Sequence, residues 1–555
     1  MILRGLIICF CVVPVLSGLA GIGFPAFGWF PPLGSEQFSF SFFIMLWDQP
    51  GLFQSLWLSL FTALVSTFLS YWLAMMLLAY LYDQSRSGWV FRFISPLLSV
   101  PHITVAVGIL FLLQPSGWLF RFISPWLTGW DRPPDISLAP DLYGYALILG
   151  LTAKELPFLL LMGLSALSQI EVNALRDRAK LLGYGPVSGW FYVIQPLLSA
   201  RMRMPVLIVM IFAVSVVDMA IVLAPSIPST LAVRILEWFW DSDLEFQFIA
   251  ASAAVLQLFL ALLCCGIWFV FGALLMRGLQ MMSRRGIRFA VSPIAAQGLR
   301  LILLTLAVIP CLLSLMGLLA IIIWSFANVW RFPSFLPDVW GLRSWGYASG
   351  DLIQAGCNSL ILGFSAAALS VVIAIIWLEN RHGKRWEGMI YIPLFLPQAS
   401  FLFGLQMLLI WLRFDGAFLT LLWAHFLFVF PYVILSLASA WRRFDNRYLD
   451  VAASLGVSSW RRFLFIKLPM LMIPILTAFA VGFAVSSALY LPTVFASNGR
   501  YATLTTEAVT LAANASRQSL GVASVMQMTL PLVVFMGCDF YTRIWASRFR
   551  YFRRA

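Results

Sequence analysis

Charge is the scarcest property of this sequence: of its 555 residues only 11% are Asp, Glu, Lys or Arg, whereas soluble domains contain about 25%. Apolar residues make up 61% of the chain. A soluble fold of this size cannot hide that much apolar surface, so lipid must replace water around most of the protein. The composition therefore excludes a soluble protein and predicts an all-α membrane protein with about 12 transmembrane helices, at about 20 residues a span.

Residues that carry out chemistry are also scarce. The three histidines lie far apart, and none begins a His-Glu-x-x-His run. The seven cysteines fall in or near apolar spans and have no metal-ligand spacing. No glycine-rich stretch ends in Gly-Lys-Ser or Gly-Lys-Thr, the pattern of a nucleotide-binding loop. We therefore expect no enzyme activity, no metal site and no bound cofactor in this chain.

The apolar runs divide into two sets of six. The expected spans are 5–24, 53–80, 94–113, 143–167, 204–224 and 248–275, and then 301–325, 352–378, 389–411, 417–440, 473–495 and 519–541. The first run follows only Arg4 and is longer than the core of a secretory signal, so we interpret it as a retained span and not as a cleaved leader.

The distribution of basic residues indicates how these spans are oriented. With the N-terminus inside, the cytoplasmic segments contain 27 of the 36 lysines and arginines, as the positive-inside rule requires. The net charge of +13 is thus a signal of topology, and we expect no nucleic acid as a partner. The predicted location is the bacterial inner membrane, with many spans in the lipid bilayer and both termini in the cytoplasm.

An internal repeat divides the chain into halves 1–285 and 286–555, whose membrane domains we place at about 53–275 and 352–541. In the later part of each half, equivalent residues lie 273 positions apart, as in the pairs Asp177 and Asp450, Gly183 and Gly456, and Pro196 and Pro469. Because six spans separate equivalent points, both copies have the same orientation, and the two halves are parallel.

The offset between the halves is larger near their beginnings. Pro101 corresponds to Pro397, and Ser55 corresponds to Ser359. The change arises because the first half has an extra stretch, 117–143, that is rich in Pro, Asp and Trp. We expect this insertion to be a loop on the outer face, where changes of length are tolerated.

Each half contains the same kind of loop between its fourth and fifth expected spans. Both loops predict a short helix that stops at a glycine, then a second helix that a proline closes before the next span. Asp450 suits the start of the first helix, and Ser458 suits the cap of the second. The shared positions are Asp177, Ala179, Leu182, Gly183 and Pro196 in the first loop and Asp450, Ala452, Leu455, Gly456 and Pro469 in the second.

Repetition argues against a simple amphipathic linker on the membrane surface, which has no reason to keep these residues at fixed offsets. The loops resemble the Glu-Ala-Ala motif of type I ABC importer permeases, in which an acid, two alanines, Leu-Gly and a later proline recur. Both loops here use Asp as the acid, and the first has Arg178 and Lys180 beside its alanine. The resemblance extends over both halves and implies the type I ABC importer permease fold.

The resemblance also implies that this chain works together with other protein subunits. The ten shared loop residues would couple this permease to an ABC ATPase subunit, present in two copies, which binds the ATP. A periplasmic or extracellular solute-binding protein would deliver a small-molecule substrate. The extra charge of the first loop implies that the two loops dock with unequal strength. On this interpretation the chain is a permease subunit and not an enzyme.

The cargo is indicated by a narrower resemblance. Two permease halves fused in one chain are similar to the permeases of the thiamine and iron(III) importers. The stretches around Ser215-Val-Val-Asp218 and Thr503-Leu-Thr-Thr-Glu-Ala508 look most like a thiamine-type subgroup whose substrate is not established. The implied cargo is a small thiamine-like or iron(III)-like solute, and the acidic residues in the spans would suit a cation.

Polar residues inside the expected spans are candidates for the translocation path, because a charge near a helix centre costs about 3 kcal/mol in lipid. The candidates are Asp218, Glu155, His102, Gln398 and Tyr490. Four of them have a structural alternative: Glu155 neutralises the adjacent Lys154, Asp218 reaches solvent at the outer end, and His102 and Gln398 are packed polar side chains.

A secondary transporter driven by an ion gradient is the main alternative function, since such proteins can also have twelve spans in two parallel halves. It would need embedded acids that carry protons, and no repeated docking loop. The loop Asp83–Gly88 is only partly similar to the signature that follows the second span of such transporters.

Overall fold

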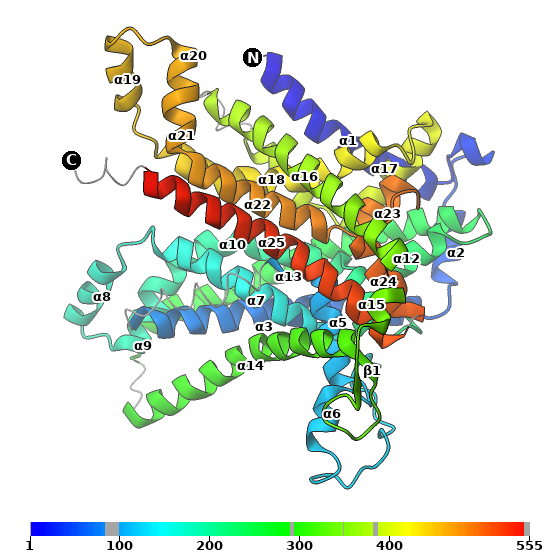
Figure 1. Cartoon of the computed structure of the whole chain (residues 1–555). Coiled ribbons are helices and arrows are strands. Elements are labelled where there is room, and N and C mark those ends of the chain that lie inside the picture. The colour runs from blue at the N-terminus through cyan, green and yellow to red at the C-terminus, as the bar shows by residue number, and fades with distance from the viewer. Residues whose placement is uncertain are drawn as a thin grey trace.

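The computed structural model describes residues 2–83, 99–288, 293–347, 349–380, 387–514 and 516–548, in which long helices run side by side (Figure 1). Within these ranges ten helices are long and apolar enough to cross a membrane, and the number rises to 12 if each of two bent helix pairs is one span. The predicted all-α fold with about 12 transmembrane helices is confirmed.

The first half contains α1 (Ile2–Ala26), η1 (Pro31–Leu33), α2 (Ser41–Trp47), α3 (Leu52–Asp83), α5 (His102–Leu113), α6 (Trp118–Ile123), α7 (Tyr145–Leu167), α8 (Val172–Leu181), α9 (Pro186–Gly189), the π-helix η2 (Trp190–Ile194), α10 (Gln195–Ser215), α11 (Asp218–Leu223), α12 (Leu231–Phe239) and α13 (Phe246–Arg284).

The second half contains α14 (Pro293–Phe326), the antiparallel pair β1 (Ala327–Val329) and β2 (Val339–Trp340), α15 (Arg343–Tyr347), α16 (Ser349–Glu379), η3 (Glu387–Phe395), α17 (Gln398–Leu412), α18 (Phe418–Arg442), α19 (Arg447–Ser454), α20 (Ser459–Arg462), the π-helix η4 (Phe463–Lys467), α21 (Leu468–Met470), α22 (Met472–Ala488), α23 (Leu491–Ser497), α24 (Leu504–Asn514) and α25 (Arg517–Arg548).

Two predicted spans, 204–224 and 473–495, extend past the ends of their helices. The helices α10 and α22 stop at Ser215 and Ala488, and the separate helices α11 and α23 follow them. The first of these spans also begins earlier, at Val187, because the preceding loop helices continue into α10, whereas α22 begins at Met472, one residue from the predicted start. A hydropathy average runs across the breaks because the residues there are as apolar as the helices. The predicted start of the third span, 94–98, and the arginines beyond 548 lie outside the described residues.

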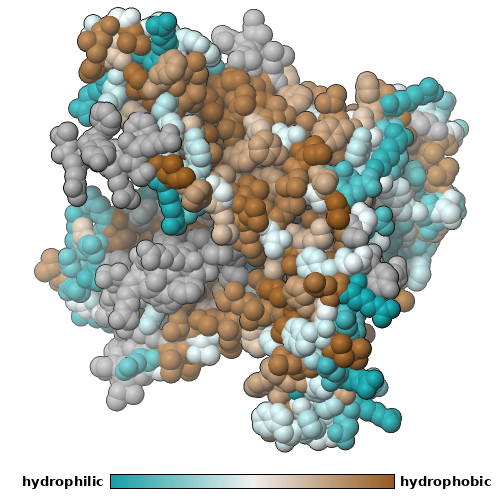
Figure 2. Space-filling model, viewed as in Figure 1, coloured by the Kyte–Doolittle hydropathy of each residue, from teal (hydrophilic) through white to brown (hydrophobic). Residues whose placement is uncertain are grey.

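The surface divides into an apolar middle and two polar ends. Figure 2 shows hydrophobic residues over the middle of the visible face and hydrophilic residues gathered toward both ends. Helices of this middle zone expose large apolar side chains such as Phe259, Leu262 and Leu312. Such side chains belong in contact with lipid tails. One polar end carries α8 and α9 together with α19 and α20 (Figure 1), and we call it the loop end.

The first helix of each half packs on the opposite half. α1 lies against α17, and α14 lies against α5. At each crossing two glycines bring the backbones together: Gly21 meets Gly404, and Gly317 meets Gly108. Small residues allow such close approach in lipid, where the hydrophobic effect does not drive helices together. Gly21 and Gly317 are equivalent residues of the two halves, as are Gly108 and Gly404. In both cases the equivalent residues lie 296 positions apart, the offset already found for the prolines.

The structure corrects the alignment of α3 with α16. The sequence comparison matched Ser55 with Ser359. In the structure the amide of Leu231 donates to Ser59 Oγ and the amide of Leu504 donates to Ser359 Oγ, each at 2.9 Å. The equivalent serines are therefore Ser59 and Ser359, about one helical turn from the predicted match. Apolar helices in which Leu and Ser recur slide by a turn in a sequence comparison because few residues distinguish one turn from the next.

The insertion 117–143 forms a lobe with the outer loop of the second half, as the neighbouring positions of α6 and β1 in Figure 1 show. The buried guanidinium of Arg121 donates to the carbonyl oxygens of Arg331 and Ser334, at 2.7 and 3.0 Å. The rings of Trp118 and Phe335 stack beside it, with their centroids 5.5 Å apart. The loop insertion that we expected is thus an additional link between the halves.

We predict that Gly21→Ala destabilises the protein and that Gly23→Ala, two residues along the same helix, does not. A methyl group at Gly21 would overlap the carbonyl of Gly404, whereas a methyl group at Gly23 meets no atom within 4 Å. Overpacking costs about 1–3 kcal/mol, which exceeds the gain of up to about 1 kcal/mol from alanine's helix propensity. Thermal melting of the detergent-purified variants tests this, and equal midpoints would show that the crossing tolerates separation.

Candidate functional site

The five candidate path residues surround one cavity between the halves. His102 and Gln398 begin α5 and α17, Glu155 lies in α7, Asp218 begins α11, and Tyr490 directly precedes α23. All five line a cavity of about 480 Å³. Residues that were selected separately for their cost in lipid therefore share one chamber, although their part in transport stays a prediction.

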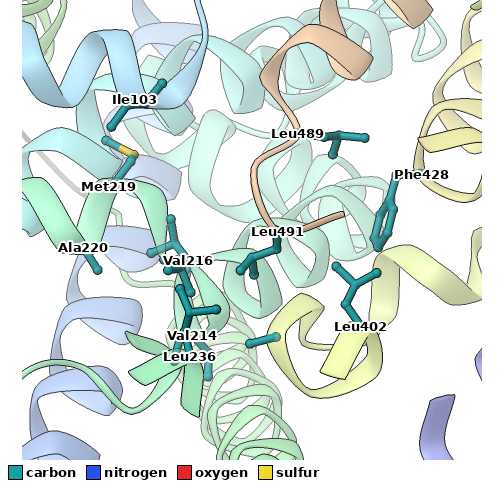
Figure 3. Packing of buried hydrophobic residues seen from close by; sticks show 14 of the residues in the cluster. Ile103, Val214, Val216, Met219, Ala220, Leu236, Leu402, Phe428, Leu489 and Leu491 are labelled. Carbon is teal, nitrogen blue, oxygen red and sulfur yellow. The ribbon is translucent and has the colours of Figure 1, made fainter. Parts of the chain in front are cut away.

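Two helix breaks shape the wall of this cavity. Val216 and Leu489, which lie 273 positions apart, have extended backbones, with ψ of 130° and 114°, and so end α10 and α22. Both side chains line the cavity. Figure 3 shows Val216 and Leu491 pointing toward one another from the two halves, with Leu489 and Phe428 beside them. The same irregularity in each half thus meets at the centre of the molecule.

The break changes the place of Asp218, which we predicted to lie inside the fifth span. It is instead in the first turn of the separate helix α11, and the main-chain amide of Met219 donates to its carboxylate. The positive end of a helix dipole favours a negative charge at this position. Asp218 is nevertheless only 7% exposed, so it does not reach solvent at the outer end as the structural alternative required.

Glu155 and Lys154 are neighbours in sequence but have different partners. The Lys154 ammonium donates to the carbonyl of Val100 at 2.5 Å. Glu155 Oε1 lies 3.4 Å from His102 Nε2. The His102 ring packs against Phe212, with the ring centroids 4.6 Å apart. The charges of Lys154 and Glu155 also attract each other, so the alternative of a neutralising pair stands beside these contacts.

A buried glutamine secures each helix break and links it to the other half. In the first half, Gln257 on α13 donates from Nε2 to the carbonyl of Val214 at 3.3 Å, an oxygen that the end of α10 leaves without its helical partner. Ser400 at the start of α17 donates to Gln257 Oε1 at 2.9 Å. Gln257 thus joins a break in one half to the first turn of a helix in the other.

The second half repeats this arrangement with Gln527 on α25. Gln527 Nε2 donates to Thr505 Oγ1 at 2.9 Å, and that hydroxyl donates to the carbonyl of Ser487 at 2.6 Å, next to the break in α22. Thr104 on α5 donates to Gln527 Oε1 at 2.8 Å. Sequence reasoning missed both glutamines, although each lies in the sixth expected span of its half and they are 270 positions apart.

An aromatic contact joins the two halves at the end opposite the loops. Phe239 of α12 contacts Phe403 of α17 and Phe495 of α23, with ring centroids 5.1 and 5.2 Å apart. These three rings come from both halves, and all are buried. The contact between the halves at this end is therefore made by apolar rings.

The first helix of each loop ends in the same backbone arrangement. In each, the residue after the glycine donates its amide five residues back, from Tyr184 to Ala179 and from Val457 to Ala452, at 3.0 Å. The glycines themselves have φ of +74° and +79°. This is the Schellman arrangement, which needs a left-handed residue after the helix. The predicted helix stops at Gly183 and Gly456 are confirmed.

Other details of the loops differ from the prediction. α8 begins five residues before Asp177, so this acid is mid-helix, whereas Asp450 is in the first turn of α19. Ser458 occupies the cap position of α20 without a side-chain capping bond. Pro196 does not close its helix, because α9, η2 and α10 run on as one span. A π-turn before a proline provides the looser backbone that its ring requires.

Pro469 is followed by the break that the prediction required. The helices on either side of Leu471 are inclined by 70°. Just before this bend, the buried Lys467 pairs with Glu379 at the end of α16 and lies 4.8 Å from the centre of the Trp441 ring. The second loop is therefore joined to its span by a bend with an ion pair, and the first by a continuous helix.

The loops present apolar side chains away from the lipid zone. Leu182 and Leu455, the equivalent residues before the glycines, are 66% and 77% exposed. The alanines Ala179 and Ala452 are buried beneath the helices, so these two shared residues do not form the outer surface. Exposed leucines at a polar end of the molecule suit contact with another protein.

The chain is similar to known transport proteins, although no protein-family model matches it. It is 30% identical to the inner membrane ABC transporter permease protein YnjC of Escherichia coli over 441 residues, which cover 79% of this chain and 78% of that protein. Two shorter relatives match 28% and 30% of this chain. They are the spermidine/putrescine transport system permease protein PotC of Haemophilus influenzae (29% identity, 65% of its length) and the putative 2-aminoethylphosphonate transport system permease protein PhnV of Salmonella typhimurium (27% identity, 66% of its length).

We predict that Gln257→Leu lowers the stability of the protein and that Gln247→Leu, on the same helix but only partly buried, has little effect. Leucine at 257 leaves the Val214 carbonyl without a donor, at a cost of about 1–3 kcal/mol. Gln527→Leu should behave like Gln257→Leu. Melting midpoints of the purified variants measure the effect, and an unchanged midpoint for both buried glutamines would show that other groups satisfy the breaks.

Proposed function

This chain belongs to the ABC transporter permeases, and we propose that it forms the translocation path of a binding-protein-dependent importer. It is a multi-pass inner membrane protein and the permease component of its transporter, not the enzyme. ABC permeases work with an ATPase and a solute-binding protein, so these are partners of this chain in general. The observation that carries the import proposal is the pair of equivalent loops that expose Leu182 and Leu455.

The loops are proposed to receive the movement of the ATPase. Each has a short helix fixed by a Schellman stop, and each is joined to a span that leads to one of the breaks at the cavity. Closure of two ATPase subunits would thus move α10 and α22, which end just before Val216 and Leu489. The proposal assigns this coupling to the ten shared loop residues, with one ATPase copy for each loop.

The cavity is proposed to be the part of the path that opens alternately to the two sides. Asp218, Glu155, His102, Gln398 and Tyr490 line it. The aromatic contact of Phe239 with Phe403 and Phe495 would be the outer closure, since α12 and α23 lie at the end opposite the loops (Figure 1). The proposal includes both termini on the cytoplasmic side and two functional halves, 1–285 and 286–555.

The cargo is proposed to be a small solute of the thiamine-like or iron(III)-like kind, as the fused halves imply. The names of the shorter relatives add polyamines and an aminophosphonate to the solutes carried by similar permeases. All of the organic solutes among these contain a positively charged nitrogen at neutral pH. The secondary transporter has no support from the relatives and serves as an outcome of the test.

The decisive experiment is affinity purification of the full-length chain in mild detergent, followed by mass spectrometry of the proteins that accompany it. Recovery of an ATP-binding subunit at about two copies per chain would support the importer. Recovery of the chain alone, with uptake that survives ATP depletion but stops when the proton gradient is collapsed, would replace it with the secondary transporter.

We predict that Gly456→Val uncouples ATP hydrolysis from uptake, while Gly456→Asn largely retains coupling. Nothing lies within 4 Å of the position, so strain at φ of +79° is the main effect of a side chain there. A left-handed β-branched residue costs about 1–2 kcal/mol, whereas asparagine tolerates this backbone. Uptake per ATP hydrolysed, measured in proteoliposomes, should fall roughly tenfold for the valine variant. Normal uptake by this variant would remove the second loop from coupling.

A further inference from the structure

We propose that the cavity binds a small organic cation and that Asp218 is the counter-ion of that cation. The inference deepens the proposed transport function, on which it rests, by naming the chemical class of the solute and the side chain that selects it. It starts from a carboxylate that is buried and that lines the cavity.

The charge balance of the cavity leaves Asp218 without a cation of its own. The carboxylate is 7% exposed, and within the described part of the chain no lysine or arginine forms an ion pair with it; its electrostatic neighbours include His102 and Tyr490. Lys154 is directed to the Val100 carbonyl, and Glu155 is in contact with His102. A buried charge without a partner costs several kcal/mol. A cation that enters the cavity would lower this cost, because it supplies the positive charge that the protein does not.

The remaining lining suits an organic cation and not a hydrated ion. Phe212, Tyr432 and Tyr490 contribute rings from three different helical segments, while Val216 and Leu489 are apolar. Aromatic faces attract quaternary or protonated nitrogen, and apolar side chains accept the carbon framework around it. The volume of about 480 Å³ is within the range of roughly 300–1,000 Å³ that holds small organic ligands.

A metal ion would require donors that the described residues do not offer. Among them no group of three or more His, Cys, Asp and Glu side chains is placed to hold a metal. Hard cations demand a shell of six or more oxygen ligands, and no preformed cluster of this kind lies among these side chains. Of the two kinds of cargo implied by the resemblance, the thiamine-like organic cation therefore fits the cavity, and bare iron(III) does not.

The two halves supply different parts of this site. The position equivalent to Asp218, 273 residues later, is Leu491, and the position equivalent to His102 is Gln398. The second half thus adds neutral and aromatic groups, including Tyr490, which lines the same cavity as Asp218. One carboxylate without a positive partner, in a chamber with aromatic walls, fits a solute with a single positive centre.

The test measures binding of labelled thiamine and labelled choline to the full-length chain with its ATPase partner in lipid nanodiscs. Both cations should bind the wild-type complex, and Asp218→Asn should weaken binding by about tenfold or more, as expected for loss of a charge-assisted contact. Excess 3,3-dimethyl-1-butanol, the neutral carbon analogue of choline, should not displace choline. Glu507→Gln, which neutralises a partly exposed carboxylate outside the cavity, should leave affinity unchanged.

The variant Asp218→Glu retains the charge and guards against misfolding as the explanation, because it should bind more tightly than Asp218→Asn. The proposal is overturned if wild type binds neither cation, if the asparagine variant binds as well as wild type, or if the neutral analogue competes equally. Failure of the importer itself is distinguished by the same preparation, since the ATPase subunit would then be absent from the purified complex.

Discussion

Every structural feature at the centre of this protein depends on one constraint: a peptide group inside a bilayer has no water to bind. Breaks in α10 and α22 release carbonyl oxygens at that depth, so they exist only where protein supplies donors. Gln257 reaches the Val214 oxygen directly, and Gln527 reaches the Ser487 oxygen through Thr505. Without these donors the two spans would have to continue as unbroken helices, and the cavity between their ends would be filled.

The same donors connect the breaks to the opposite half. Ser400 and Thr104, at the starts of α17 and α5, donate hydrogen bonds to the two glutamines. The same two helices pack against α1 and α14 through glycine contacts. Each half therefore holds the other at two levels, one of backbone packing and one of hydrogen bonding. A movement that opens the chamber outward must either carry these paired helices together or break buried hydrogen bonds.

Much of the fold follows from the sequence because lipid imposes simple rules. Apolar length predicts the spans, and the glycines of the loops predict where two helices stop. The breaks at Val216 and Leu489 were not predicted, because their side chains are as apolar as those of an intact helix. Gln257 and Gln527 were missed for a related reason: a neutral amide in a long apolar helix has a clear role only once a released carbonyl lies beside it.

The candidate path residues show how much can be predicted from the free-energy cost of placing a polar group in lipid. Each was selected because a polar group in lipid needs a reason, and the structure places all five around one cavity. This free-energy cost does not predict which partner each residue has. Only the fold directs Lys154 to Val100 and Glu155 to His102, and only the fold moves Asp218 from a span to the first turn of α11.

Fusion of the two halves explains why the site is unequal. Two identical subunits related by an axis along the membrane normal would place two carboxylates opposite each other at the centre, and their repulsion would add to the cost of burial. In one chain the second copy can change independently, and here Leu491 stands where the first copy has Asp218. The loops differ in the same way: the first is charged and joined to its span by a continuous helix, and the second is bent and held by Lys467 and Glu379. An unequal pair can thus keep one charge at its centre without the second burial cost and the repulsion that a symmetric pair would add.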